Sequence, residues 1–170
     1  MNNQTIFSPD LVDLLLISEE VSKRLKVSCL TRRLLLGMLA LRENNSFHGY
    51  LLKHNMDDEQ ITEKITEFWQ SDIPKIDSTE KGNFIVGDHT FIISEKLFKT
   101  FNFAIDLAKK SYNTNMVNQD FVFAALTETY TEEYLDLLIS CLGVDAEIPE
   151  TVNDNVPKKD LICLLYTSDA

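Results

Sequence analysis

Apolar residues recur with helical spacing through the first seventy residues of the chain. A stripe of Leu and Val positions runs from Leu11 to Leu25 with one gap at Ser18, and charged residues occupy the other side. Ser8-Pro9 precedes this stripe and is a typical helix start, because serine can cap a helix and proline is tolerated in its first turn. Similar starts precede three more apolar patterns and predict further helices, beginning near Thr31, Ser46 and Asp57.

The second of these helices is the most apolar of the four. The run at 34–41 leaves almost no polar surface, which is typical of a helix surrounded by others. Asn55 suits the left-handed stop that comes after the third helix. Asp57 with Gln60 forms a variant of the capping box at the start of the fourth. Four helices with a shared core are therefore predicted before residue 70.

The helical pattern stops at residue 71. Pro74, Gly82 and Gly87 lie in the next twenty residues, and proline and glycine disfavour helix interiors. Apolar residues at 84–86 and 89–93 flank the turn sequence Gly87-Asp88, so we predict a short β-hairpin within a linker.

The first pattern begins again after this linker. Ser94 and the apolar positions after it repeat the pattern of Ser8 at a distance of 86 residues, and Asn118 with its apolar run repeats Thr31 at 87 residues. Each unit is too small to bury its apolar stripe alone. We therefore expect an all-α fold in which two pseudo-twofold related four-helix repeats pack into one globular domain.

The end of the second repeat is less regular than that of the first. Pro149 and a polar run come directly after its third helix, so its fourth helix is expected to be missing. The last ten residues resemble translated sequencing-adapter sequence and are interpreted as a non-native tail, with a natural short C-terminal segment as the alternative. The expected boundaries are 1–148 for the domain (repeat one 7–70, linker 71–92, repeat two 93–148), 149–160 for a polar linker and 161–170 for the tail.

Composition and charge restrict the classes of partner. The 170 residues include 16 Lys and Arg against 27 Asp and Glu, and the formal charge of −11 repels nucleic acids and anionic membranes. The N-terminus lacks the regions of a signal peptide, and no apolar run is long enough to span a membrane. Cys29, Cys141 and Cys163 have no Cys-x-x-Cys spacing, which argues against a disulfide framework or a zinc site. A cytoplasmic protein is expected.

No catalytic, cofactor-binding or metal-binding constellation is predicted. His48, His54 and His89 fall in three different elements and share no i, i+4 spacing, so helix-terminal or surface positions are favoured over a metal site. Cys29 precedes a helix start and could be a nucleophile. Cys29 and Cys141 both border apolar runs, however, which favours buried side chains with a structural role.

The ordered set of motifs resembles the double Clp repeat domain at the N-terminus of Clp-type AAA+ unfoldases, the ATPases that thread proteins into a partner protease or out of aggregates. The matching motifs are F-S-P-D-L from Phe7, T-x-x-L-L-L-G-M-L from Thr31 where the family has T-E-H-L-L-L-G-L, K-H-N-M-D from Lys53, and the second copy. The resemblance covers about 7–148. It implies an all-α fold and a docking role for protein substrates or adaptor proteins.

The chain departs from the family after the capping residues. Family members commonly carry an acidic residue there in both copies, and in some bacterial members these acids help to hold phosphorylated arginine. Arg32 and Gln119 occupy those positions here, and a guanidinium cannot receive another guanidinium, so phosphoarginine recognition is not expected.

The G-x-x-x-x-G-K-[ST] loop of nucleotide hydrolysis is absent, so this segment is expected to be non-catalytic. It would bind substrates or adaptors and raise their concentration near an unfoldase pore, reaching the protease only through an ATPase module beyond residue 160. A freestanding Clp-repeat adaptor or interaction protein is the alternative.

Six residues are candidates for contacting a partner. The arginine pair lies in the first turn of the second helix, where positive charge opposes the helix dipole, and this small penalty suggests a role outside the helix. The residues after Asn118 are their counterparts in the second repeat. Phenylalanines on more than one face of a later helix are either core or exposed beside a groove between repeats, where they would bind unfolded segments. The candidates are Arg32, Arg33, Gln119, Asp120, Phe98 and Phe103.

Overall fold

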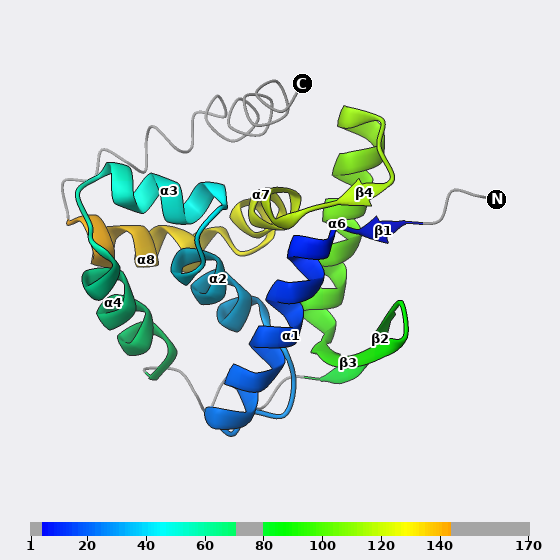
Figure 1. The fold of residues 1–170 in the computed structure, drawn as a ribbon, viewed down its shortest axis with the longest axis horizontal. Coiled ribbons are helices and arrows are strands. Elements are labelled where there is room, and N and C mark those ends of the chain that lie inside the picture. Colours follow the sequence, from blue (N-terminus) through cyan, green and yellow to red (C-terminus); the bar gives the residue numbers. More distant parts are fainter. Residues whose placement is uncertain (1–4, 71–79, 144–170) are drawn as a thin grey trace.

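Most of the described chain is helical. The computed structural model describes residues 5–70 and 80–143, and this part contains seven helices and two small two-stranded sheets (Figure 1). The prediction of a helical fold is confirmed in outline, and the strands add to it. The helices are α1 (Pro9–Arg24), α2 (Arg32–Leu41), α3 (Ser46–Lys53), α4 (Asp58–Gln70), α6 (Glu95–Tyr112), α7 (Gln119–Thr129) and α8 (Thr131–Leu142), and the strands are β1 (Ile6–Phe7), β2 (Lys81–Val86), β3 (His89–Ser94) and β4 (Met116–Val117).

Serine side chains begin α1 and α6 in the same way. Ser8 Oγ accepts a hydrogen bond from the Leu11 amide at 3.2 Å, and Ser94 Oγ accepts one from the Leu97 amide at 3.1 Å. Each serine satisfies an amide of the first turn that has no carbonyl partner within the helix. Both predicted helix starts are confirmed.

The starts of α2 and α7 also share one geometry. Thr31 Oγ1 accepts a hydrogen bond from the Leu34 amide at 3.1 Å, and Asn118 Oδ1 accepts one from the Phe121 amide at 3.0 Å. The capping roles of both residues are confirmed. Each of these four helices therefore starts at a cap that bonds an amide only three residues later in the sequence.

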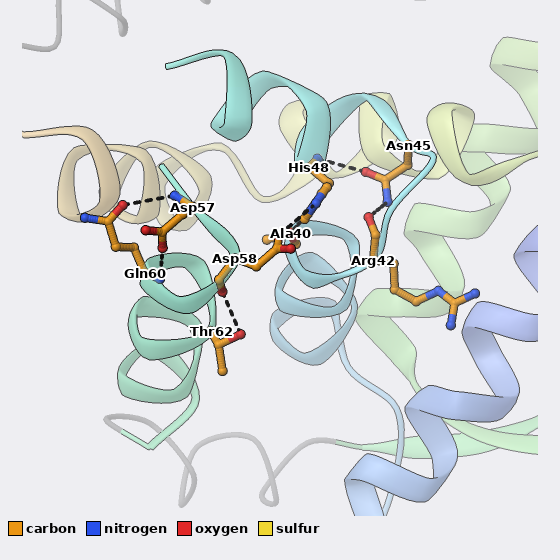
Figure 2. Close-up of polar contacts among 8 residues, drawn as sticks. All are labelled: Ala40, Arg42, Asn45, His48, Asp57, Asp58, Gln60 and Thr62. Carbon is orange, nitrogen blue, oxygen red and sulfur yellow. Dashed lines mark hydrogen bonds and ion pairs between the residues drawn. The ribbon is translucent and has the colours of Figure 1, made fainter. Parts of the chain in front are cut away.

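The start of α3 differs in detail from the prediction. Ser46 is the first helical residue, but Asn45 is the cap, because its Oδ1 accepts hydrogen bonds from the Phe47 and His48 amides at 3.0 and 3.1 Å. Asn45 also donates through Nδ2 to the Arg42 carbonyl at 2.8 Å, which ties the loop before α3 to the end of α2 (Figure 2).

The capping box of α4 is confirmed. Asp57 Oδ1 accepts a hydrogen bond from the Gln60 amide at 2.8 Å, and Gln60 Oε1 accepts one from the Asp57 amide at 3.0 Å (Figure 2). Asn55 adopts the predicted left-handed conformation after α3, with φ of 72°. These two signals place α4 directly after α3.

The polar gap at Ser18 lies on the buried face of α1, as the apolar pattern predicted. Ser18 is fully buried, and its hydroxyl donates to the Leu14 carbonyl at 2.6 Å, so the polar group is satisfied within the helix. Val21 and Leu25 are only partly buried and pack at the margin of the core. The buried face of α1 thus includes Ser18 and Ser22 rather than Val21.

The central position predicted for α2 is confirmed. All seven residues at 34–40 are buried, and α2 contacts α1, α3, α4, α6 and α7. Gly37 lies directly under the indole of Trp69, at a spacing that leaves no room for a Cβ atom. The close approach brings the end of α4 against the start of α2, where Trp69 Nε1 donates to the Arg33 carbonyl at 3.1 Å.

The predicted β-hairpin is confirmed. β2 and β3 pair in antiparallel register from Lys81↔Ser94 to Val86↔His89, and Gly87 supplies a positive φ of 61° in the turn. The inner face places Phe84 against Phe7, Phe98 and Phe101, with ring centroids 5.1 to 6.1 Å apart. The hairpin therefore covers one side of α6 (Figure 1).

Two short parallel pairings, which were not predicted, join the two halves of the chain. β1 pairs with β4, and Ser8 N donates to the Val117 carbonyl at 2.9 Å. Leu30 pairs with Ile93, and Ser94 N donates to the Leu30 carbonyl at 2.8 Å. Ser8, the residue before α1, is thus tied to Val117, two residues before α7. Ser94, the residue before α6, is tied in the same way to Leu30, two residues before α2.

Some predicted boundaries lie outside the described residues. They are residues 71–79 of the linker, the end of the second repeat after 143, the polar linker at 149–160 and the tail at 161–170. Within the described residues, none of the helices combines the length and apolar character needed to cross a membrane.

Candidate binding clefts

Arg32 lies between the start of α2 and the end of α7. Its Nη1 donates to the carbonyl of Thr129, the last residue of α7, at 2.7 Å, and its guanidinium lies 4.4 Å from the centre of the Tyr130 ring. A helix end presents carbonyls with no partner inside the helix, together with the negative end of the dipole. Arg32 therefore stabilises the end of α7 from the neighbouring helix.

Arg33 makes the corresponding contact with α4. Its Nε and Nη2 both donate to the Phe68 carbonyl, at 3.1 and 2.6 Å, and its guanidinium lies 3.9 Å from the centre of the Phe68 ring. The positive charges that oppose the dipole of α2 thus complement the ends of two other helices. The dipole penalty has an internal explanation, and by itself it does not indicate a partner.

Burial and charge act in opposite directions around this pair. Burial lowers the pKa of the Arg32 guanidinium, while Tyr130 and Glu133 raise it by their Coulombic interaction. Burial also raises the pKa of the Tyr130 hydroxyl, and a hydrogen bond to Arg33 opposes that effect. Arg32 keeps its charge at neutral pH, because a guanidinium does not lose its proton in proteins.

Asp120 lies at the start of α7 and caps α3. One of its carboxylate oxygens accepts hydrogen bonds from the backbone amide and the hydroxyl of Ser46, at 3.0 and 2.7 Å. With Asn45 accepting from the next two amides, three amides of the first turn of α3 have partners. The negative charge also favours the positive end of the α3 dipole.

Gln119 is 5% exposed, and its Oε1 has no hydrogen-bond partner in the described part of the chain. Gln119 and Asp120 are neighbours in sequence, but Gln119 does not line the cleft that Asp120 lines.

Phe98 and Phe103 are 44% and 40% exposed. One of the two was expected to be exposed, and both are. Their positions on α6 lie on opposite flanks of its buried face, which Leu97, Phe101 and Ala104 mark. Phe98 contacts the Phe84 ring of the hairpin edge-on. The two phenylalanines therefore do not form one patch.

Two clefts adjoin the starts of α2 and α7. The cleft at the start of α7 runs along α3, and we call it the α3 cleft. It has a volume of about 610 Å³ and is lined by residues 43–46, 48–50, 52, 53, 58 and 120. The cleft at α2, the α8 groove, has a volume of about 340 Å³. It is lined by Arg33, Glu67, Phe68, Glu133, Asp136, Leu137 and Ser140.

The two clefts use corresponding positions of the chain. Five of the seven residues of the α8 groove lie 87 residues from a residue of the α3 cleft, the same distance that relates Thr31 to Asn118. Residue types at these positions differ, so the clefts share their place in the fold but not their chemistry. The corresponding pairs are Arg33 and Asp120, Ser46 and Glu133, Gly49 and Asp136, Tyr50 and Leu137, and Lys53 and Ser140.

His48 forms part of the wall of the α3 cleft. It is 4% exposed, so it is not a surface residue, although it does lie in the first turn of α3. Nδ1 donates to the Ala40 carbonyl at 2.6 Å, because a carbonyl can only accept, and Nε2 lies 3.4 Å from Asp58 Oδ1 (Figure 2). The side chain thereby links α3 to the end of α2 and the start of α4.

The described residues contain no group of three or more His, Cys, Asp or Glu side chains that could hold a metal ion. His54 lies just after α3 and His89 begins β3, where His89 Nε2 lies 3.0 Å from Glu19 Oε1. Cys29 is buried, and burial raises the pKa of the half-buried Cys141 thiol to about 11. A thiol with a raised pKa is a poor nucleophile at neutral pH.

Sequence reasoning missed most of the residues that complete the clefts. Glu133, Asp136 and Ser140 lie on one face of α8 at helical spacing, and this stripe reads in the sequence as an ordinary exposed face. Phe68, near the end of α4, is only partly buried and lines the groove. Two signals were available: the 87-residue correspondence, and the acidic run at 129–136, which is interpreted from sequence as a solvated helix start, with a docking surface for a basic partner as the minor alternative.

Comparison of the chain with protein families, with curated proteins and with solved structures gave no match.

Proposed function

We propose that this chain is a non-catalytic protein-binding domain built from two Clp repeats. In this proposal it docks substrates or adaptor proteins for a Clp-type AAA+ unfoldase of the cytoplasm, in protein quality control and proteolysis. Binding occurs at the starts of α2 and α7, and the segment itself breaks and forms no covalent bond. Its effect on the unfoldase is to raise the local concentration of substrate.

The observation that carries the proposal is the correspondence between the two clefts. A cleft at the start of α2 and a cleft at the start of α7 use positions 87 residues apart. The volumes of about 340 and 610 Å³ suit one or a few side chains of a flexible segment rather than a folded surface. A repeated domain that binds extended segments would carry two such clefts.

The pairing between the two halves supports the repeat interpretation. The hydrogen bond from Ser8 N to the Val117 carbonyl has its counterpart in the bond from Ser94 N to the Leu30 carbonyl. Ser94 comes 86 residues after Ser8, and Val117 comes 87 after Leu30. Exchange of the two halves therefore reproduces the contact, as expected for pseudo-twofold packing of a duplicated unit.

A titration with an unfolded protein tests this function. A reduced and carboxymethylated protein that stays unfolded in buffer is added to the isotope-labelled chain, and amide chemical shifts are monitored by NMR. We expect the largest shifts at the first turns of α2 and α7 and along α3 and α8. Absence of shifts, or shifts confined to the surface of α1, would contradict the proposal.

The second candidate function is a freestanding adaptor made of the same repeats. It shares the clefts and differs only in having no ATPase module joined to it. Sequencing of the gene beyond codon 160 separates the two, because an in-frame G-x-x-x-x-G-K-[ST] loop would assign the chain to an unfoldase.

A further inference from the structure

We propose that the α8 groove binds an unmodified basic segment, with an arginine or lysine side chain lying between α4 and α8. This inference rests on the proposed binding function and names the chemistry of one of its two clefts. The groove residues that carry it are Glu67, Glu133 and Asp136 at the rim, and Phe68 and Leu137 at the floor.

Charge complementarity identifies the partner. Glu67 lies on α4, and Glu133 and Asp136 lie one turn apart on α8, so carboxylates border the groove from both sides. None of the three forms an ion pair within residues 5–70 and 80–143. Two arginines lie near these carboxylates. Arg33 is directed to the Phe68 carbonyl and ring, and Arg32, which interacts electrostatically with Glu133, donates to the Thr129 carbonyl. An incoming cation would therefore meet a net negative groove.

The shape of the groove limits what can enter. Leu137 is 2% exposed and Phe68 is partly buried, so the floor is apolar and firmly packed. A volume of about 340 Å³ is at the small end of ligand sites and suits one long side chain. Arginine and lysine combine an apolar stem with a charged head, which matches an apolar floor below charged rims.

The groove already holds one guanidinium. Arg33 packs over the Phe68 ring at 3.9 Å while its nitrogens bond the Phe68 carbonyl, so the Phe68 side of the floor already pairs with a planar cation of the chain. The corresponding position in the α3 cleft is Asp120, which is occupied by the amide and hydroxyl of Ser46. The α3 cleft is also lined by Glu43 and Asp58, and Asp58 Oδ1 lies 3.4 Å from His48 Nε2. Two of its three carboxylates therefore already have a partner in the chain, whereas none of the three at the α8 groove forms an ion pair within the described residues.

The experiment uses the 170-residue chain and short fluorescein-labelled peptides of alternating arginine and leucine, with glutamate–leucine and phosphoarginine–leucine peptides for comparison. Affinity is measured by fluorescence anisotropy between about 50 and 300 mM salt. We expect the arginine peptide to bind more tightly than either comparison peptide. The affinity should fall as salt rises, because ion pairs at an open groove are screened.

Matched variants locate the site on the chain. Glu67→Gln and Asp136→Asn remove groove charges, whereas Glu63→Gln on α4 and Glu132→Gln on α8 remove exposed charges outside the groove. All four change the net charge equally, so long-range attraction is weakened to the same extent. Each groove variant should weaken binding by about two- to fivefold relative to its control, the range measured for partly exposed ion pairs.

The outcomes separate this inference from the proposed function. If the arginine peptide binds but the groove variants and their controls have equal affinity, the groove assignment is overturned and the binding function stands. Tighter binding of the phosphoarginine peptide would also overturn it, because added phosphate reverses the side chain's charge. If no peptide and no unfolded protein binds, both proposals fail.

Discussion

The contact between Gly37 of α2 and Trp69 of α4 gives a direct test of the packing. An ideal Cβ built on Gly37 of α2 would lie 2.5 Å from Trp69 Nε1 and 2.6 Å from two carbons of the same ring. Ordinary contacts begin near 3.4 Å, so Gly37→Ala forces the indole of α4 away from α2. Gly49 of α3 has nothing within 4 Å of its ideal Cβ and is exposed, which makes Gly49→Ala the matched control.

The two alanine variants should have opposite effects on the free energy of unfolding. Alanine in place of a helical glycine contributes about 1 kcal/mol of stability, and this applies to both positions. At Gly37 the gain is opposed by overpacking, which costs about 1–3 kcal/mol. Displacement of the indole also removes the bond from Trp69 Nε1 to the Arg33 carbonyl, worth about 1 kcal/mol. We expect Gly37→Ala to lose about 1–3 kcal/mol and Gly49→Ala to gain up to about 1 kcal/mol.

Urea unfolding measures both values, and fluorescence of Trp69, the single tryptophan of the chain, reports the displaced ring. A third variant, Trp69→Leu, removes the clashing atoms. Alanine at Gly37 should become neutral or stabilising in that background, which a double-mutant cycle detects as coupling. If Gly37→Ala is as stable as the natural sequence and leaves the fluorescence unchanged, the close packing of α2 against α4 is refuted.

Three further predictions concern the site residues. Asp120→Ala should lower the free energy of unfolding by about 1–2 kcal/mol, because Ser46 loses its cap; an unchanged urea midpoint would contradict this. At pH 8, Cys141 should react with iodoacetamide at least about tenfold more slowly in the native chain than in the unfolded chain, because a pKa of about 11 leaves little thiolate. Mass spectrometry of the Cys141 peptide gives both rates. Arg32→Glu should gain affinity for phosphoarginine peptides by restoring the acid of the family, and calorimetry that shows equal affinities would count against that assignment.

The helices and their starts could be predicted because their signals are local. Ser8, Thr31, Ser94 and Asn118 each bond an amide three residues later, so the cap and its helix lie in one short stretch of sequence. The hairpin was predictable for the same reason, since Gly87-Asp88 joins strands that are adjacent in the chain. The correspondence between the halves was visible as a repeated spacing.

The roles of the candidate residues could not be predicted in this way. Arg32 bonds a carbonyl 97 residues away and Arg33 one 35 residues away, and nothing in the sequence marks Thr129 or Phe68 as acceptors. Two arginines in a first turn are unusual, and from sequence this favours a partner outside the helix. In the structure the partners are the ends of α7 and α4.

The sequence by itself determined the helical class, the order of the helices and the starts of most of them, the hairpin and the spacing of the repeat, because hydrophobic periodicity and capping act over a few residues. Only the tertiary structure decided which polar side chains face each other. The burial of Ser18 and His48, the capping of α3 by Asp120 and the carboxylates along the α8 groove depend on how distant helices pack. Packing brings together residues that can be any number of positions apart in the chain, so the sequence around one residue does not indicate which distant residue it will contact.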